Sequence, residues 1–132
     1  MIGLDTNILL RAATNDNAAQ ALAVRKLFGA LSAENPGYVS IVTLIECVWT
    51  LRTSYRADRT TVANFVKSLM GAQEILVEHS GAVGRALDSA NGQRRDFADA
   101  LIAQLALEAG CEYTLTFDRT AAQLPGMRLL EA

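Results

Sequence analysis

The 132-residue sequence contains little cysteine and histidine, with two residues of the first and one of the second. The spacing of Cys47 and Cys111 fits neither a disulfide framework nor a metal site. Both cysteines have apolar neighbours in the sequence, so we expect two buried free thiols in a reducing, cytoplasmic environment. We expect the single histidine, His79, at the surface or at a helix cap rather than on a metal.

Aromatic residues and long apolar runs are also scarce. Aromatic side chains make up 6% of the sequence, so the core must be built mainly from alanine, leucine, valine and isoleucine. No apolar run approaches the roughly 20 residues that cross a membrane, and Asp5 and Arg11 interrupt the N-terminal apolar stretch, which argues against a signal peptide. A chain of this length can bury about two thirds of its unfolded surface, and it shows no repeat or linker. We therefore expect one domain over residues 1–132.

Neither sign of charge is in large excess. The net charge of −2 argues against a simple basic nucleic-acid binder. If four carboxylates were neutralised by cations in one site, however, the rest of the chain would carry +2. The net charge alone therefore excludes little.

Apolar periodicity and turn residues predict strands that alternate with helices. We expect short strands at residues 1–4, 38–40, 74–78, 111–118 and 127–132. We expect helices at 9–12, 18–33, 41–55, 57–71 and 80–90, and one within 91–110 that stops at Gly110. Such an alternation favours parallel pairing through right-handed crossovers. The predicted fold is α/β, a three-layer α/β/α sandwich with a central parallel sheet of four or five short strands.

Three of these helices carry specific expectations about packing. The helix at 18–33 is expected to turn three leucines inward, Leu22, Leu27 and Leu31. The helix at 57–71 has a cap at Asp58 and apolar residues at helical spacing, Val62, Phe65, Val66 and Leu69. The helix within 91–110 is apolar on every side beyond its first turn, which is typical of a buried helix.

Two of the predicted strands end at an aspartate, Asp5 and Asp118. In open parallel sheets, ligands bind beyond the carboxyl ends of the strands, so both carboxylates would be delivered to that edge. Either aspartate can instead cap the turn or helix that follows it. The spacing alone leaves both interpretations open.

Two further acids stand inside apolar helices. Glu46 is the only charged residue between Glu34 and Arg52, and a buried ionised carboxylate is costly unless it is paired or bound to a metal. Alternatively, Glu46 faces water at the edge of its helix. Asp99 follows Asp96 by three residues on one helix face; Asp96 suits the N-cap, and the helix dipole also favours an acid at Asp99.

Few cations are available to pair with these acids, since the chain has only the lysines Lys26 and Lys67, both distant in sequence. Clustered carboxylates without cationic partners raise one another's pKa, and a divalent cation would relieve the repulsion. All-oxygen ligands favour Mg²⁺ or Mn²⁺ over zinc. Acid-only sites of this kind are suited to phosphoryl chemistry.

Four stretches, "LDTNILLRA" (4–12), "SIVTLIECVWTL" (40–51), "DFADALIAQLA" (96–106) and "LTFDR" (115–119), together resemble the PIN-domain ribonucleases. The resemblance covers essentially the full chain and is closest to the VapC-type toxins of bacterial toxin–antitoxin pairs. It implies that the metal-binding catalytic acids are Asp5, Glu46, Asp99 and Asp118. It also implies an auxiliary acid and small polar residues beside the site, namely Asp96, Thr6, Asn7 and Thr116.

The resemblance further implies an activity and partners. The expected reaction is Mg²⁺- or Mn²⁺-dependent hydrolysis of RNA phosphodiesters without a covalent enzyme intermediate, blocked by a small VapB-like antitoxin. Arginines near the site could hold the RNA backbone, with Arg11, Arg52, Arg56, Arg94, Arg95 and Arg119 as candidates. The helices at 41–55 and 57–71 carry Trp49, Tyr55 and Phe65, which could form a homodimer surface, although core packing explains much of the same pattern.

Three other functions are compatible with parts of the pattern. A phosphatase or phosphoacceptor domain would use Asp5 as nucleophile, but that chemistry normally needs an aspartate where Asn7 stands and a lysine that the C-terminal half lacks. A non-catalytic module would use the acids for a structural cation or for helix capping. A housekeeping RNA-processing nuclease would share the site but not the toxin role.

Overall fold

The computed structural model describes residues 1–14, 16–90 and 96–132. The chain forms two compact units, Met1–Glu78 and His79–Ala132, which we call unit 1 and unit 2. None of the helices within the described ranges is both long and apolar enough to span a bilayer.

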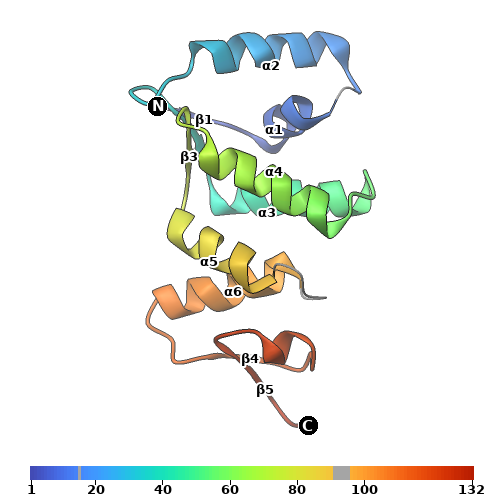
Figure 1. The fold of residues 1–132 in the computed structure, drawn as a ribbon, viewed down its shortest axis with the longest axis vertical. Coiled ribbons are helices and arrows are strands. Elements are labelled where there is room, and N and C mark those ends of the chain that lie inside the picture. The colour runs from blue at the N-terminus through green and yellow to red at the C-terminus, as the bar shows by residue number, and fades with distance from the viewer. Residues whose placement is uncertain (15, 91–95) are drawn as a thin grey trace. The chain divides into compact units, whose positions relative to one another are not determined.

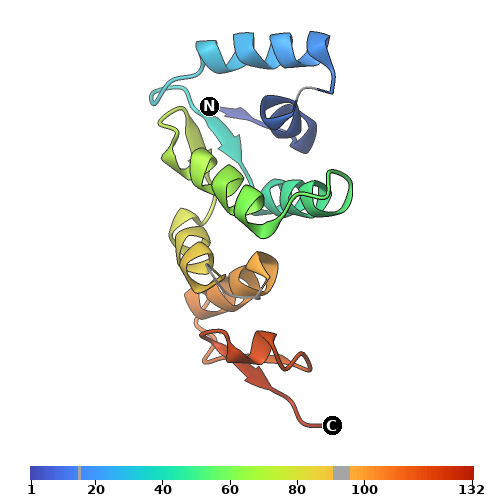
Figure 2. The ribbon, with the colours of Figure 1, turned by 45° about the vertical axis from the view of Figure 1, so that its right-hand side comes forward.

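Unit 1 contains three strands and four helices among its described residues. In chain order these are β1 (Ile2–Gly3), α1 (Thr6–Ala13), α2 (Ala18–Ala30), β2 (Gly37–Val39), α3 (Ile41–Thr53), α4 (Arg59–Gly71) and β3 (Ile75–Val77). The strands form a parallel sheet in the order β1-β2-β3. Figures 1 and 2 show α3 and α4 lying side by side, with α2 stacked on α1.

Close packing inside this sheet depends on a glycine. Gly37 pairs with Ile2 on one side and with Ile75 on the other. A Cβ atom at Gly37 would lie 2.5 Å from Cδ1 of Leu4 and 3.1 Å from Cδ1 of Leu31, both of them buried. The absence of a side chain at Gly37 therefore lets Leu4, directly after β1, and Leu31 pack closely against β2.

The helix ends of unit 1 follow from their capping residues. Asp58 accepts a hydrogen bond from the Thr61 backbone N–H at 2.7 Å and starts α4, as predicted. The helix expected at 9–12 begins earlier, at Thr6, because Asp5 caps it. The helix expected at 18–33 ends earlier, at Ala30.

The predicted inner face of the second helix is partly wrong. Leu31 is buried, but Leu22 is 52% exposed. Ala21 and Val24 are the buried residues of α2, so its inner stripe runs through small side chains, and Leu22 lies about 100° round the helix from Ala21. In α4, the predicted positions Val62, Val66 and Leu69 are buried and Phe65 is partly so.

Unit 2 contains a helix pair and a small sheet. Its described elements are α5 (Ser80–Ala90), α6 (Phe97–Glu108), β4 (Thr114–Thr116), the 3₁₀ helix η1 (Ala121–Gln123) and β5 (Met127–Leu129). All three figures of the ribbon show α5 and α6 side by side. Alanines on both helices are buried in the contact, which lets the two backbones approach closely. The strands β4 and β5 pair in parallel, with Thr114 opposite Met127.

Two predictions for unit 2 need correction. Cys111 is exposed, because the left-handed turn at Gly110 (φ 100°) carries the chain away from α6, to which its apolar neighbours belong. Burial of α6 on every side is also wrong: Ile102 is 51% exposed, since α6 contacts α5 and β4 with only part of its surface. The α/β class and the parallel pairing of short strands are confirmed.

Candidate functional site

Asp5 is the first acid beyond the carboxyl end of β1. It is the N-cap of α1: its Oδ1 atom accepts a hydrogen bond of 2.8 Å from the Thr6 backbone N–H. Its Oδ2 atom has no hydrogen bond or ion pair with any described residue, and the side chain is exposed. The capping and the ligand interpretations are therefore compatible, because each uses a different carboxylate oxygen.

Glu46 lies on α3 and is exposed, so the water-facing alternative is correct and the buried one is wrong. The apolar sequence around it supplies the buried face of α3, through Leu44, Cys47, Val48 and Leu51, while Glu46 occupies the opposite face. Glu46 forms no hydrogen bond or ion pair within the described part of the chain.

The buried thiol of Cys47 shows that these two acids share one neighbourhood. Burial, together with the negative charges of Glu46 and then Asp5, raises the pKa of Cys47 to about 12. The Cys47 thiol also lies 3.9 Å from the carbonyl oxygen of Thr6, which follows Asp5. Contact between α1 and α3 therefore holds Asp5 and Glu46 around the same point of unit 1.

The first turn of α6 carries the acids of unit 2. Asp96 is the N-cap, as expected, and its Oδ1 atom accepts from the Ala98 backbone N–H at 3.1 Å. Asp99 is partly buried and makes no such bond among the described residues. Burial raises the pKa of Asp99, and the charges of Asp96 and Asp118 raise it further. Capping explains Asp96, whereas Asp99 lies in the first turn of α6, where the helix dipole favours an acid but no hydrogen bond from a described residue uses its carboxylate.

Asp118 follows β4 and is exposed. Its Oδ1 atom accepts from the backbone N–H groups of Thr120 and Ala121, at 2.8 and 3.1 Å. Its own backbone N–H donates to Oγ1 of Thr116 at 3.0 Å. Thr116 thus contacts the backbone that carries Asp118, and Oδ2 of Asp118 has no partner in the described chain.

The four predicted acids thus form one pair in each unit, Asp5 with Glu46 and Asp99 with Asp118. Within the described residues, no group of three histidine, cysteine, aspartate or glutamate side chains is arranged to hold a metal ion. Thr6 is buried beside Asp5, and Asn7 is exposed. Both pairs consist of carboxylates with free oxygens, a donor set that fits a hard divalent cation.

Two features of unit 1 were missed in the sequence. Glu78, directly after β3, accepts a hydrogen bond of 2.9 Å from the Ile41 backbone N–H at the start of α3. Burial raises the pKa of Tyr38, and the contact with Glu78 raises it further. The position of Glu78 just after a strand, like those of Asp5 and Asp118, was the available signal. It supports the start of the helix that carries Glu46.

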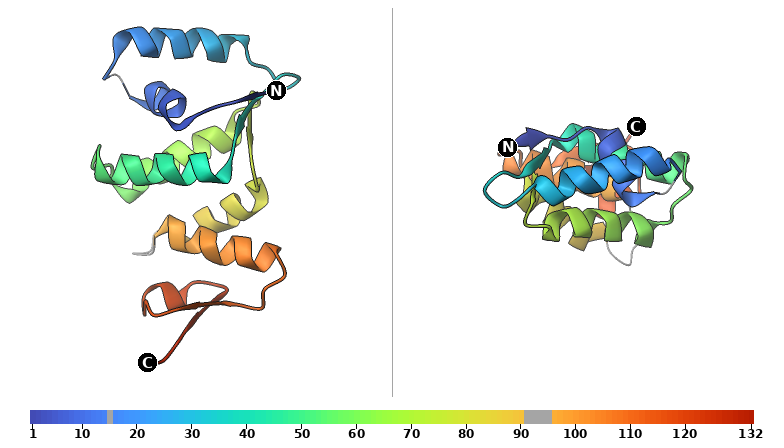
Figure 3. Two further views of the ribbon diagram at one scale, coloured as in Figure 1. Left: turned by 180° about the vertical axis from the view of Figure 1, so that it is seen from behind. Right: turned by 90° about the horizontal axis from the view of Figure 1, so that it is seen from above.

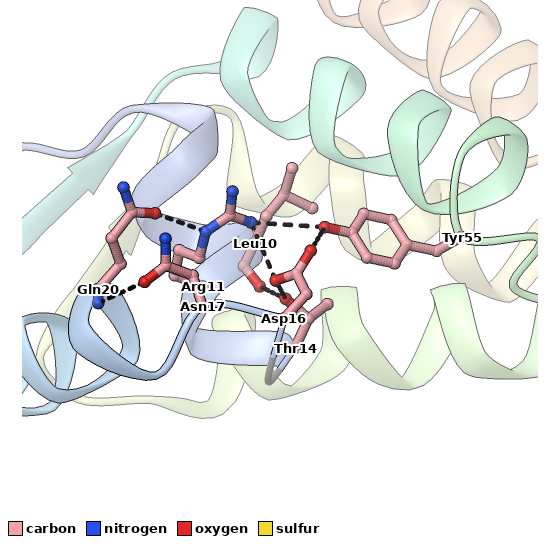
Figure 4. Close-up of polar contacts among 7 residues, drawn as sticks. All are labelled: Leu10, Arg11, Thr14, Asp16, Asn17, Gln20 and Tyr55. Carbon is pink, nitrogen blue, oxygen red and sulfur yellow. Dashed lines mark hydrogen bonds and ion pairs between the residues drawn. The ribbon is translucent and has the colours of Figure 1, made fainter.

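The second feature is a polar network that binds the end of α1 to the end of α3 (Figure 4). The Tyr55 hydroxyl donates to Oδ2 of Asp16 at 2.6 Å, and Arg11 lies 3.2 Å from Oδ1 of Asp16. Arg11 also donates to Gln20 at 2.6 Å. Its charge is thus already partnered, which weakens its candidacy for RNA; the candidates Arg94 and Arg95 lie outside the described residues.

His79 is at the surface and directly precedes α5, as expected. Its Nδ1 atom lies 2.6 Å from Oε1 of Glu108, and its φ of 53° is left-handed. Glu108 is therefore a partner of His79 and of Arg85, whose Nη2 atom lies 3.4 Å from Oε2 of Glu108, rather than part of the candidate site.

In a comparison with protein families, the family described as PIN domain matches residues 2–127. The matched range contains all four acids of the candidate site. Comparison with curated proteins found no match.

Proposed function

The chain belongs to the PIN domain family, and we propose that it is a Mg²⁺- or Mn²⁺-dependent endoribonuclease that acts as the toxin of a toxin–antitoxin pair. Members of this family are generally nucleases, and they generally use divalent metal ions. The match over residues 2–127 is the observation that carries the proposal. It supports one nuclease domain over residues 1–132 as well, because the match runs through both units.

Asp5, Glu46, Asp99 and Asp118 are the proposed metal ligands and catalytic acids. Support comes from the chemistry of each pair: Asp5 and Asp118 use one oxygen for the backbone and keep the other free, while Glu46 and Asp99 have no partner in the described chain. Burial raises the pKa of Asp99, and the negative charges of Asp96 and Asp118 add to that effect. Carboxylates of this kind are suited to hold divalent cations, which would supply an activated water and offset the charge of the scissile phosphate.

The chain's own residues orient these acids. The Thr6 backbone fixes one oxygen of Asp5, and the contact of Cys47 with the Thr6 carbonyl holds α3, and with it Glu46, against α1. In unit 2, Asp96 caps the helix that carries Asp99, and Thr116 binds the backbone of Asp118. These residues thus keep the carboxylates in place with little loss of side-chain freedom when substrate binds.

Cleavage of labelled structured RNAs tests the activity and the site together. The wild type is compared with Asp5→Asn in unit 1, Asp99→Asn in unit 2, and the matched control Asp88→Asn, an exposed aspartate on α5, in Mg²⁺, Mn²⁺ and EDTA. Loss of even an indirect metal partner costs about 10- to 100-fold, so we expect each site variant to lose at least about 100-fold and the control to keep full activity. Equal cleavage by all four proteins, or cleavage in EDTA, would contradict the proposal.

The proposed toxin role includes three further properties. A small VapB-like antitoxin blocks the site, the chain associates with itself, and the protein acts in the cytoplasm. Its support is the resemblance of the four motif stretches to VapC-type toxins. Expression of the wild type should arrest growth, and Asp99→Asn should not. RNA cleavage in vitro with no effect on growth would favour the housekeeping nuclease. Chromatography with mass measurement tests self-association.

A further inference from the structure

One exposed ridge of α3 carries an unusual order of side chains. Glu46, Trp49 and Arg52 follow one another at intervals of three residues, and all are exposed, on the side of α3 away from the buried Cys47. Trp49 is 64% exposed, a large apolar surface to leave in water. The helix rise places Trp49 about 4.5 Å along the axis from Glu46 and Arg52 about as far again. A carboxylate, an indole and a guanidinium therefore form one row.

Positive charge gathers at the C-terminal end of this row. Arg52, Arg56 and Arg59 are all exposed, and none forms an ion pair within 4.0 Å with a described residue. Hydrogen bonds from Thr61 are the main cause of the lowered pKa of Asp58, and the charge of Arg52 makes a smaller contribution. The three guanidinium groups thus remain available to an anionic partner.

The backbone at this end is held in place before any partner binds. The Ala57 N–H donates to the Leu51 carbonyl at 2.9 Å, which folds the chain back on the last turn of α3. The Tyr55 hydroxyl is fixed by Asp16 and Arg11 (Figure 4). Arg56 has a left-handed φ of 52°, a conformation that few residues other than glycine adopt. This end of the row is therefore a defined surface.

We propose that Trp49 is a substrate-binding residue that stacks on an unpaired base of the RNA, while the arginines beyond it hold the adjoining phosphates. The inference rests on the proposed nuclease function, since Glu46 at the other end of the row is a proposed metal ligand. Exposed aromatic rings interleaved with cations are the common means of binding single-stranded nucleic acid. A base paired in a duplex has no free face for the indole, so the row selects unpaired nucleotides.

The charge of the arginines matches this occupant better than it matches a second copy of the chain. An antiparallel interface between copies would pair Glu46 of one copy with Arg52 of the other, whereas the phosphates of RNA match the positive charge of Arg52, Arg56 and Arg59 together. Val42, 72% exposed and one turn before Glu46, would join Trp49 in an apolar interface but lies away from the arginines. It is therefore the matched control.

Trp49 is the only tryptophan of the chain, so its fluorescence reports directly on this surface. Fluorescein-labelled oligouridylate, the same oligonucleotide annealed to oligoadenylate, and an abasic version are titrated into the intact protein in EDTA, which prevents cleavage. We expect oligouridylate to quench Trp49 over the same concentrations at which its anisotropy rises, and the duplex and abasic RNAs to quench little. Binding of oligouridylate without any fluorescence change would overturn the inference and leave the nuclease proposal intact.

Three variants then separate stacking from packing. Loss of one stacked base corresponds to about a 10-fold or greater loss of affinity, so Trp49→Ala should raise KM by that factor on single-stranded RNA with kcat and the Mg²⁺ midpoint unchanged. Trp49→Phe should restore most of the affinity, and Val42→Ala should leave it unchanged. A KM unaffected in Trp49→Ala, together with loss of a dimer in both Trp49→Ala and Val42→Ala, would show that the surface faces a second copy. Failure of the wild type to bind or cleave any RNA would overturn both proposals.

Discussion

Alkylation of the two cysteines offers a direct test of how α1 and α3 pack. Iodoacetamide at about pH 8 should label Cys111 of the folded protein and leave Cys47 unlabelled. Cys111 is exposed, whereas Cys47 is completely buried and contacts the Thr6 carbonyl. The thiolate is the reactive form, and burial, aided by the charges of Glu46 and Asp5, raises the pKa of Cys47 to about 12 from an ordinary 9.0.

The size of the protection follows from that pKa. The thiolate population of Cys47 at about pH 8 falls about 1000-fold relative to a thiol of the ordinary value. Thiolates of higher pKa are better nucleophiles, with a Brønsted slope of about 0.4–0.5, which recovers about 20-fold. Ionisation alone therefore slows alkylation of Cys47 about 50-fold, and burial of the sulfur slows it further.

Mass spectrometry of proteolytic peptides at a series of labelling times measures both rates in one sample. In urea both thiols should react, which confirms that each is free. Glu46→Gln removes one of the charges that raise the pKa, so it should speed labelling of Cys47 without exposing it. Equal rates for Cys47 and Cys111 in the folded wild type would refute the packing of α1 on α3, and with it the shared neighbourhood of Asp5 and Glu46.

Three further predictions test other parts of the structure. Gly37→Ala should lower the free energy of unfolding by about 1–3 kcal/mol in urea titrations, because its Cβ would overlap Leu4, whereas Gly3→Ala, which meets no atom within 4 Å, should cost less. Asp99 has a raised pKa, so its charge opposes folding above that pKa and the penalty disappears as pH falls; Asp99→Asn should therefore raise the melting temperature at neutral pH without metal, and the gain should vanish in acid. Tyr55→Phe removes the largest cause of the lowered pKa of Asp16, so NMR titration of that carboxyl should show the pKa rising toward its ordinary value.

Much of the fold could be predicted because the relevant signals are local. Apolar spacing identified the helices, and Asp58 and Asp96 cap α4 and α6 where their residue type suggested. The strands expected at 111–118 and 127–132 are shorter in the structure, Thr114–Thr116 and Met127–Leu129, because a strand extends only as far as its partner pairs with it. Partners are distant in sequence and leave no local mark.

Burial was predicted less well, because it depends on what packs against each face. Leu22 and Cys111 are exposed although their neighbours are apolar. Glu46 is exposed although the apolar sequence of its helix suggests a buried position, because the buried residues of α3 lie on the opposite side of the helix. The composition of a helix does not specify which of its faces meets a neighbour when nearly all of its residues are apolar.

The acids themselves could be found in the sequence, because a carboxylate at a strand end or inside an apolar helix contradicts its surroundings wherever it occurs. Their chemistry, and the family that matches residues 2–127, were thus accessible without coordinates. Only the tertiary structure assigned Asp5 and Glu46 to one neighbourhood, through the buried thiol of Cys47 between α1 and α3. It also showed that Asp5 and Asp118 each use one carboxylate oxygen for backbone N–H groups and keep the other free. The physical reason is that residue type determines which charges a chain carries, whereas only packing between distant segments determines which of those charges act on one another.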